Sequence, residues 1–241
     1  MQNQFDPRQP AVNTATVGVP RAARDVGLRS YMLSVYNYMA SGILLTGIVA
    51  MLFANSGMAA QVMATPLRWL VILAPLGFVM AMSFGLNRMS TGTLQALFWA
   101  FSVAMGLSLS TIFLVYTGVS IAQTFFAVAA GFAGLSLWGY TTKKDLSGWG
   151  TFLIMGVVGL LVAMVANLFL QSGAMMLAIS AIGVLIFAGL TAYDTQRIKS
   201  LYDQVAGTDM MGKVVIMGAL SLYLDFINMF MFLLSFMGDR R

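Results

Sequence analysis

Residues 214–237 have the sequence VVIMGALSLYLDFINMFMFLLSFM, an apolar run that holds a single charged residue, Asp225. A helix needs about 20 such residues to cross a hydrocarbon core of about 30 Å. Because no water reaches that core, a spanning backbone has to satisfy its own hydrogen bonds, and a helix does so within one segment. The run therefore predicts a transmembrane helix with one carboxylate inside it.

Six similar runs precede this one, so the prediction extends to most of the chain. They lie near residues 31–54, 67–86, 94–116, 121–140, 150–170 and 174–194. The chain is 59% hydrophobic and 9% charged, whereas soluble domains carry about 25% charged residues. None of the runs alternates between apolar and polar residues as barrel strands do. The expected fold class is an all-α integral membrane protein with seven transmembrane helices in residues 31–241.

The polar residues 1–30 are expected to form a cytoplasmic tail, becoming helical from Arg21 onward. The first apolar run is too long for a signal-peptide core of about 7 to 15 residues, so we expect it to remain as the first span. With the N-terminus inside, ten of the 13 Lys and Arg residues fall on the cytoplasmic side. That bias is typical of a bacterial inner (plasma) membrane protein. The same orientation leaves the C-terminus outside with Arg240 and Arg241, unless one run is re-entrant and both termini lie inside.

Three missing residue types limit the chemistry of this chain. It has no Cys, His or Glu, which excludes disulfides, thiolate nucleophiles and metal or haem sites built on Cys and His. Asp is then the only acidic side chain, and no cofactor is expected. The net charge is +5, but the basic residues are scattered singly or in pairs, which argues against a nucleic-acid partner.

Glycines inside the apolar runs predict helices that pack closely, because small residues let two backbones approach. The chain has 24 glycines. Those inside the runs include Gly42, Gly47, Gly131, Gly134, Gly156 and Gly159.

Two aspartates lie where membrane proteins rarely tolerate a charge. Asp225 is about eleven residues into its run, or roughly 16 Å along a helix, close to the bilayer centre. Asp194 is at the inner end of the sixth run. A carboxylate at mid-membrane costs about 2.5–3.5 kcal/mol, so it is expected to face the bundle or a water-filled cavity. The seventh run has a matching face of small and polar residues at spacings of three and four, namely Gly218, Ser221, Asp225 and Asn228, and Ser235 extends it.

The two aspartates taken together suggest a proton-sensitive cation pathway. Two carboxylates held close in a medium of low dielectric do not both ionise readily, so a pair that shares one proton is expected to titrate near neutral pH and to attract cations. Simpler alternatives remain open for each residue. Asp225 could be a protonated packing residue, and Asp194 could reach water at the interface or cap the following segment.

At these same residues the chain resembles the Bax inhibitor-1 family, also called the transmembrane Bax inhibitor motif or YccA-like family. The resemblance rests on GLTAYDTQRIK at residues 189–199 and on ALSLYLDFIN at residues 219–228. The segment KKDLS at residues 143–147 and the seven-run layout also match, from about residue 25 to the end.

The resemblance implies a fold in which the last helix is central and the other six surround it. It also implies a pH-sensitive calcium leak whose sensor is the pair Asp194 and Asp225, aided in the closed state by an arginine that corresponds to Arg88. Calcium prefers six to eight oxygen ligands. The two aspartates with Ser221 and Asn228 are too few for a tight site, so we expect weak or transient calcium binding. The partners are then lipid, protons and calcium.

Two other classes of function are weighed against the leak. Some bacterial relatives are substrates and modulators of the membrane-bound ATP-dependent protease FtsH. The resemblance therefore also predicts a non-enzymatic interaction role, in which the protease binds the N-terminal tail. Two membrane aspartates also occur in intramembrane aspartyl proteases, but Asp225 lacks the Gly-x-Gly-Asp motif and no Pro-Ala-Leu element is present. We therefore expect no enzymatic activity.

Overall fold

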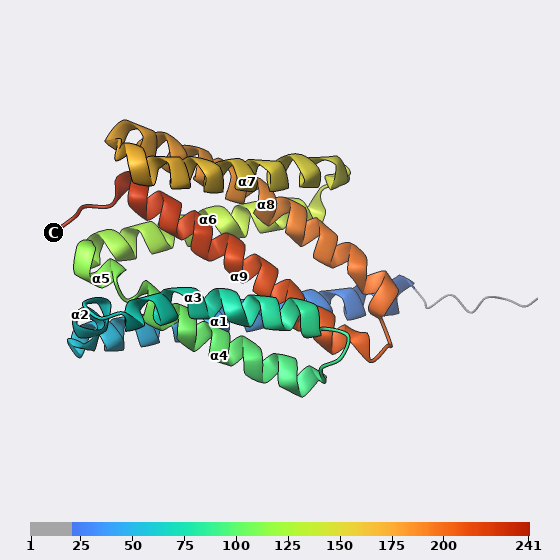
Figure 1. The fold of residues 1–241 in the computed structure, drawn as a ribbon. Helices are drawn as coiled ribbons and strands as arrows, with labels where there is room; N and C mark the ends of the chain where they lie inside the picture. Colours follow the sequence, from blue (N-terminus) through green and yellow to red (C-terminus); the bar gives the residue numbers. More distant parts are fainter. Residues whose placement is uncertain (1–20) are drawn as a thin grey trace, which may run out of the picture.

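The structure is a computed structural model that describes residues 21–241; residues 1–20 of the predicted tail lie outside that range. The described part of the chain is helical almost throughout (Figure 1). Its helices are α1 (Arg21–Asn55), α2 (Met58–Met63), α3 (Leu67–Gly85), α4 (Thr91–Leu109), α5 (Ile112–Val115), α6 (Gly118–Thr141), α7 (Ser147–Leu170), α8 (Gly173–Val205) and α9 (Met210–Met237).

Seven of these segments are long and apolar enough to span a membrane, which confirms the predicted fold class. They are α1, α3, α4 together with α5, α6, α7, α8 and α9. Figure 1 shows the start of α1 and the C-terminus at opposite ends of the bundle. That arrangement fits an odd number of crossings and not a re-entrant run with both termini on one side. We call the end at which α1 begins the inner end, after the predicted orientation.

The C-terminal helix α9 is the core of the bundle. Of its most apolar stretch, 67% is buried, against 11% for the corresponding stretches of α3 and α7. It packs against α1, α4, α6 and α8, while α3 packs on α4 and α7 packs on α8. The prediction of a central last helix is confirmed, but the shell around it is formed by four helices, and α3 and α7 lie outside that shell.

A buried polar network ties α9 to two of its neighbours. The Thr46 hydroxyl on α1 donates to the Ser102 carbonyl oxygen on α4 over 2.8 Å. Since that bond uses the only hydroxyl proton of Thr46, the Tyr223 hydroxyl, 2.6 Å away, is the donor to Thr46 Oγ1. The Tyr223 ring also contacts Phe101 at 5.0 Å between centroids. One face of α9 is thereby fixed against α1 and α4.

Replacing Thr46 with valine is expected to destabilise the protein by about 1–3 kcal/mol. The change keeps the shape of the side chain but leaves the buried Tyr223 hydroxyl without an acceptor, and an unmade buried hydrogen bond carries that cost. Thermal unfolding in detergent measures the effect. Thr46→Ser keeps the hydroxyl and should retain most of the stability; a valine variant as stable as wild type would contradict the network.

The C-terminal residues are held at the outer end by backbone hydrogen bonds. The Thr117 N–H donates to the Asp239 carbonyl oxygen over 3.1 Å, and the Arg241 N–H donates to the Val115 carbonyl oxygen over 2.9 Å. The Arg240 guanidinium lies 5.9 Å from the centroid of the Tyr116 ring. The arginine pair that runs against the charge bias of the chain is therefore anchored at the outer end by the connection between α5 and α6.

Candidate functional site

The helices α8 and α9 form an antiparallel hairpin along the polar face predicted for α9. Near the outer end, the Ser180 hydroxyl donates to Ser235 Oγ over 3.1 Å. Near the inner end, a Cβ added at Gly218 would lie 3.3 Å from Ile198, so the two helices are in close contact there. The two aspartates lie between these points, one on each helix.

The structure brings Asp194, Asp225 and Ser221 together in the interior. Asp225 is 5% exposed and Asp194 is 9% exposed. Ser221 lies near the Asp194 side chain, and Asp194 is near enough to Asp225 for their charges to interact. Asp225 Oδ2 is buried and has no hydrogen-bond partner among the described residues. The α8–α9 interface therefore contains a carboxylate pair with one unsatisfied oxygen atom.

Two other predicted site residues form no hydrogen bond or ion pair with either aspartate in the described part of the chain. The Asn228 amide donates to the Leu224 carbonyl oxygen over 2.8 Å, so it bonds its own helix. Arg88 is exposed in the turn between α3 and α4, and within residues 24–241 no ion pair joins it to either aspartate. The cation whose charge acts on Asp194 is Arg197, which sequence reasoning missed. The sequence does contain an indication of this contact, because Arg197 follows Asp194 by three positions, a spacing that brings two side chains together on a helix.

The polar residues that follow Asp194 on α8 hold the connection between α6 and α7. The Leu146 N–H donates to Gln196 Oε1, and Gln196 Nε2 donates to the Lys144 carbonyl oxygen, both over 2.8 Å. Lys199 Nζ donates to the Tyr140 carbonyl oxygen over 2.7 Å. Two of the segments that resemble the Bax inhibitor-1 family are thus in direct contact, and several of their polar side chains have a structural role.

Replacing Gln196 with leucine is expected to loosen the α6–α7 connection without changing the aspartates. The change removes two hydrogen bonds of about 0.5–1.5 kcal/mol each, so amide exchange at Leu146 should accelerate about tenfold or more. Hydrogen exchange read by mass spectrometry measures the effect. Gln204→Leu, an exposed glutamine on the same helix, is the matched control. Equal exchange in the two variants would mean that Gln196 does not hold the connection.

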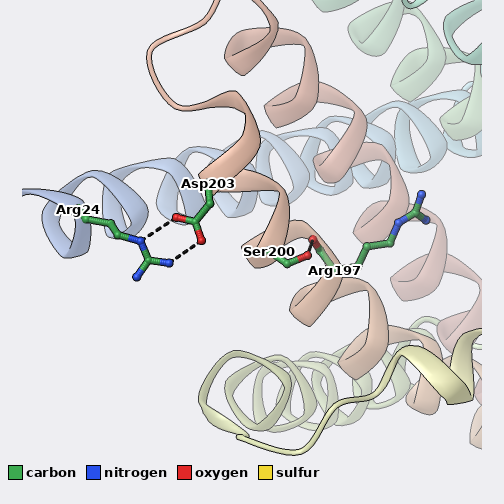
Figure 2. Close-up of polar contacts among 4 residues, drawn as sticks. All are labelled: Arg24, Arg197, Ser200 and Asp203. Carbon is green, nitrogen blue, oxygen red and sulfur yellow. Dashed lines mark hydrogen bonds and ion pairs between the residues drawn. The ribbon is translucent and has the colours of Figure 1, made fainter. Parts of the chain in front are cut away.

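An exposed ion pair joins the inner ends of α1 and α8 (Figure 2). Arg24 Nε donates to Asp203 Oδ1 over 2.7 Å, and Arg24 also contacts Asp203 Oδ2 at 2.5 Å. Deeper in the same interface the Tyr31 hydroxyl donates to the Ile198 carbonyl oxygen over 3.2 Å. Figure 2 shows the Arg197 side chain pointing away from the Arg24–Asp203 pair.

Asp145, in the connection between α6 and α7, is exposed to solvent, in contrast to the buried Asp194 and Asp225. The Ser147 N–H donates to its Oδ1 atom over 2.9 Å, which keeps its pKa below the ordinary value for aspartate. A group with a lowered pKa contributes stability that is lost only as the pH falls through that low value. Asp145 therefore stays ionised at the pH values at which the buried pair is to be tested.

The acidic side chains of the described range do not form a preformed metal site. No three of them come close enough there to hold a metal ion together. The pair offers carboxylate oxygens plus the Ser221 hydroxyl, whereas calcium takes six to eight oxygen ligands. If a cation binds at the pair, most of its ligands have to be water.

Comparisons with known proteins agree with the fold and the motifs. A family model described as "Inhibitor of apoptosis-promoting Bax1" matches residues 28–241. The chain is 47% identical over 219 residues to a protein of Rickettsia prowazekii (strain Madrid E), across 90% of this chain and 92% of that protein. It is 45% identical over 226 residues to the inner membrane protein YbhL of Escherichia coli (strain K12), across 92% of this chain and 95% of that protein. The chain belongs to the Bax inhibitor-1 family of membrane proteins.

Proposed function

We propose that the protein is a cation leak of a bacterial inner membrane, with calcium as the ion, and that protons bound by Asp194 and Asp225 control it. The observation that supports this proposal most is the state of the Asp225 carboxylate. Its Oδ2 atom is buried without a hydrogen-bond partner in the described part of the chain, and the buried carboxylate of Asp194 is near enough for the two charges to interact.

An unsatisfied buried acceptor costs about 1–3 kcal/mol, and more if it is charged. Three species can relieve that cost at Asp225, namely a proton, a water molecule or a cation. A proton turns one carboxyl group into a donor for the other, so the pair is stable with one proton shared between Asp194 and Asp225. Loss of that proton leaves two like charges in a medium of low dielectric, where their repulsion is strong.

The exchange between these two states would change how α8 packs on α9. The pair lies between the contacts of Ser180 with Ser235 and of Ile198 with Gly218, so a charge change acts in the middle of the hairpin. A central helix that shifts in its shell is a reasonable gate, since α9 contacts α1, α4, α6 and α8. Calcium would pass with most of its water ligands retained, consistent with the small number of protein oxygens.

The positive charge near the pair is part of the same proposal. Arg197 follows Asp194 by three positions on α8, a spacing that brings two side chains together on a helix. The role that the family resemblance implies for Arg88 stays a prediction. Comparing Arg88→Gln with Arg197→Gln separates the two: the residue that matters will shift the pH at which the flux changes.

The proposal is tested by calcium flux into dye-loaded proteoliposomes at pH 6, 7 and 8. We expect wild-type protein to carry calcium above the background of empty liposomes, with a rate that differs between pH 6 and pH 8. Flux equal to that of empty liposomes at every pH would exclude the leak.

An interaction role is the alternative, in which the protein binds and modulates the FtsH protease. It depends on the N-terminal tail, whose residues 1–20 lie outside the described range. Deleting residues 2–20 should abolish association with the protease while leaving any calcium flux intact. Association retained after the deletion would mean that the protease does not bind the protein through its tail.

A further inference from the structure

A long crevice lies between α1 and α6 on the flank of the bundle. It consists of two adjoining grooves, of about 660 Å³ and about 400 Å³, that share the lining residues Ile43, Phe125 and Phe226. Both α1 and α6 pack on α9, and Phe226 of α9 forms part of the floor. Because the crevice opens on the flank, its natural content in a membrane is lipid.

The two walls of the crevice match in length and register. One wall is formed by α1, which contributes a residue at every third or fourth position from Arg29 to Met51. The other wall is formed by α6, with the same spacing from Gly118 to Tyr140. Each stripe is about 33 Å long at 1.5 Å per residue, close to the hydrocarbon thickness of about 30 Å. The helices run in opposite directions, so Arg29 and Tyr140 lie together at the inner end.

Polar groups in the larger groove are confined to that inner end. They belong to Arg29, Tyr36, Ser136 and Tyr140, and the other lining residues are apolar. The Arg29 side chain is exposed and makes no ion pair within the part of the chain that the structure describes. Lys199 adds a second positive charge at this level, since its Nζ lies 4.7 Å from the centroid of the Tyr140 ring.

This combination has the chemistry of a phospholipid site. Arginine binds phosphate through two parallel hydrogen bonds, and basic pockets between helices on the cytoplasmic side recognise lipid headgroups. We propose that the larger groove holds one anionic phospholipid of the inner leaflet, with its acyl chains against α1 and α6 and its phosphate on Arg29. Such a lipid would also touch Phe226, the residue that follows Asp225 on α9.

The proposal is tested by native mass spectrometry of the full-length protein, purified and incubated with phosphatidylglycerol or phosphatidylcholine. We expect wild-type protein to retain one phosphatidylglycerol molecule and to retain phosphatidylcholine at least fivefold less. Ala133→Phe puts a ring into the groove and should abolish retention. Ala130→Phe is the matched control, because Ala130 is an exposed alanine on the same helix that does not line either groove.

The headgroup contact is tested separately by Arg29→Gln, which should remove the preference for phosphatidylglycerol. Lys143→Gln, which removes an exposed positive charge in the nearby α6–α7 connection, should leave that preference unchanged. The proposal is overturned if no lipid is retained by wild type, if Ala133→Phe and Ala130→Phe retain equal amounts, or if the two charge variants behave alike. None of these readouts depends on calcium flux, so the proposed leak and the lipid site can fail independently.

Discussion

The Asp225→Asn variant is expected to carry calcium at a rate that no longer changes between pH 6 and pH 8. Asparagine has the shape of the protonated acid and cannot lose a proton, so Asp194 is left as the one carboxyl group and no second charge can form beside it. The variant should therefore hold, at every pH, the flux that wild type reaches at the acid end of the range. Dye-loaded proteoliposomes measure this, with the protein content of each preparation matched.

Asp209→Asn is the control for that experiment, because Asp209 is an exposed residue at the start of the same helix. It should keep the full pH dependence of wild type. An Asp225→Asn protein with unchanged pH dependence would remove the pair from the mechanism, whatever its flux. The buried aspartates would then be packing residues, as the simpler reading of the sequence allows.

Gly139→Ala is expected to destabilise the protein substantially. A Cβ at Gly139 would overlap the carbonyl oxygen of Ala192, which is backbone and cannot rotate away. The helices α6 and α8 would have to separate at the level where Thr195 donates to Ser136, over 3.4 Å, one residue from Asp194. Overpacking of this kind costs about 1–3 kcal/mol and sometimes more. We expect a net loss of about 2 kcal/mol in thermal unfolding in detergent.

The same substitution on the same helix provides the comparison. Gly134 is exposed, and a Cβ there would meet no atom within 4 Å. Gly134→Ala should be neutral or stabilising by up to about 1 kcal/mol, because alanine favours a helix more than glycine does. If both variants lost the same stability, the effect would not arise from the contact between α6 and α8.

Hydropathy was enough to predict the seven spans, because each apolar run is long enough to cross a bilayer. It failed at the inner end of the sixth run, which was expected to end at residue 194, whereas α8 continues to Val205. The added turns contain polar residues, but Ile198 and Tyr202 are buried on one face, and Tyr202 packs on Tyr31 of α1. A segment stabilised by one buried face has too little mean hydropathy to be counted as part of a span.

Glycines illustrate what composition cannot provide. The prediction of close helix packing is confirmed for Gly42, where a Cβ would collide with Phe98, and for Gly156, where it would collide with Ile186. It is wrong for four others, where a Cβ would meet no atom within 4 Å: Gly47, Gly131, Gly134 and Gly159. Which face of a helix meets a neighbour depends on the arrangement of the bundle, and that information is not local in the sequence.

The aspartate pair was found from sequence because a carboxylate in an apolar run is costly wherever the helices pack. Its surroundings were harder to predict. Asn228 follows Asp225 by three positions, and its amide donates to the Leu224 carbonyl oxygen of the same helix, a bond that the sequence pattern does not predict. Arg197 was missed because it lies beyond the expected end of the sixth span, although it follows Asp194 by only three positions.

Infrared spectroscopy of the protein in lipid between pH 6 and pH 8 measures most directly whether the two aspartates share a proton. The carbonyl stretch of a protonated carboxylic acid is separate from that of a carboxylate, so it reports the shared proton itself. We expect a protonated band in wild type that decreases as the pH rises, and that titrating band should be missing from both Asp194→Asn and Asp225→Asn. A band that does not change with pH, or one that titrates equally in wild type and both variants, would contradict the shared proton.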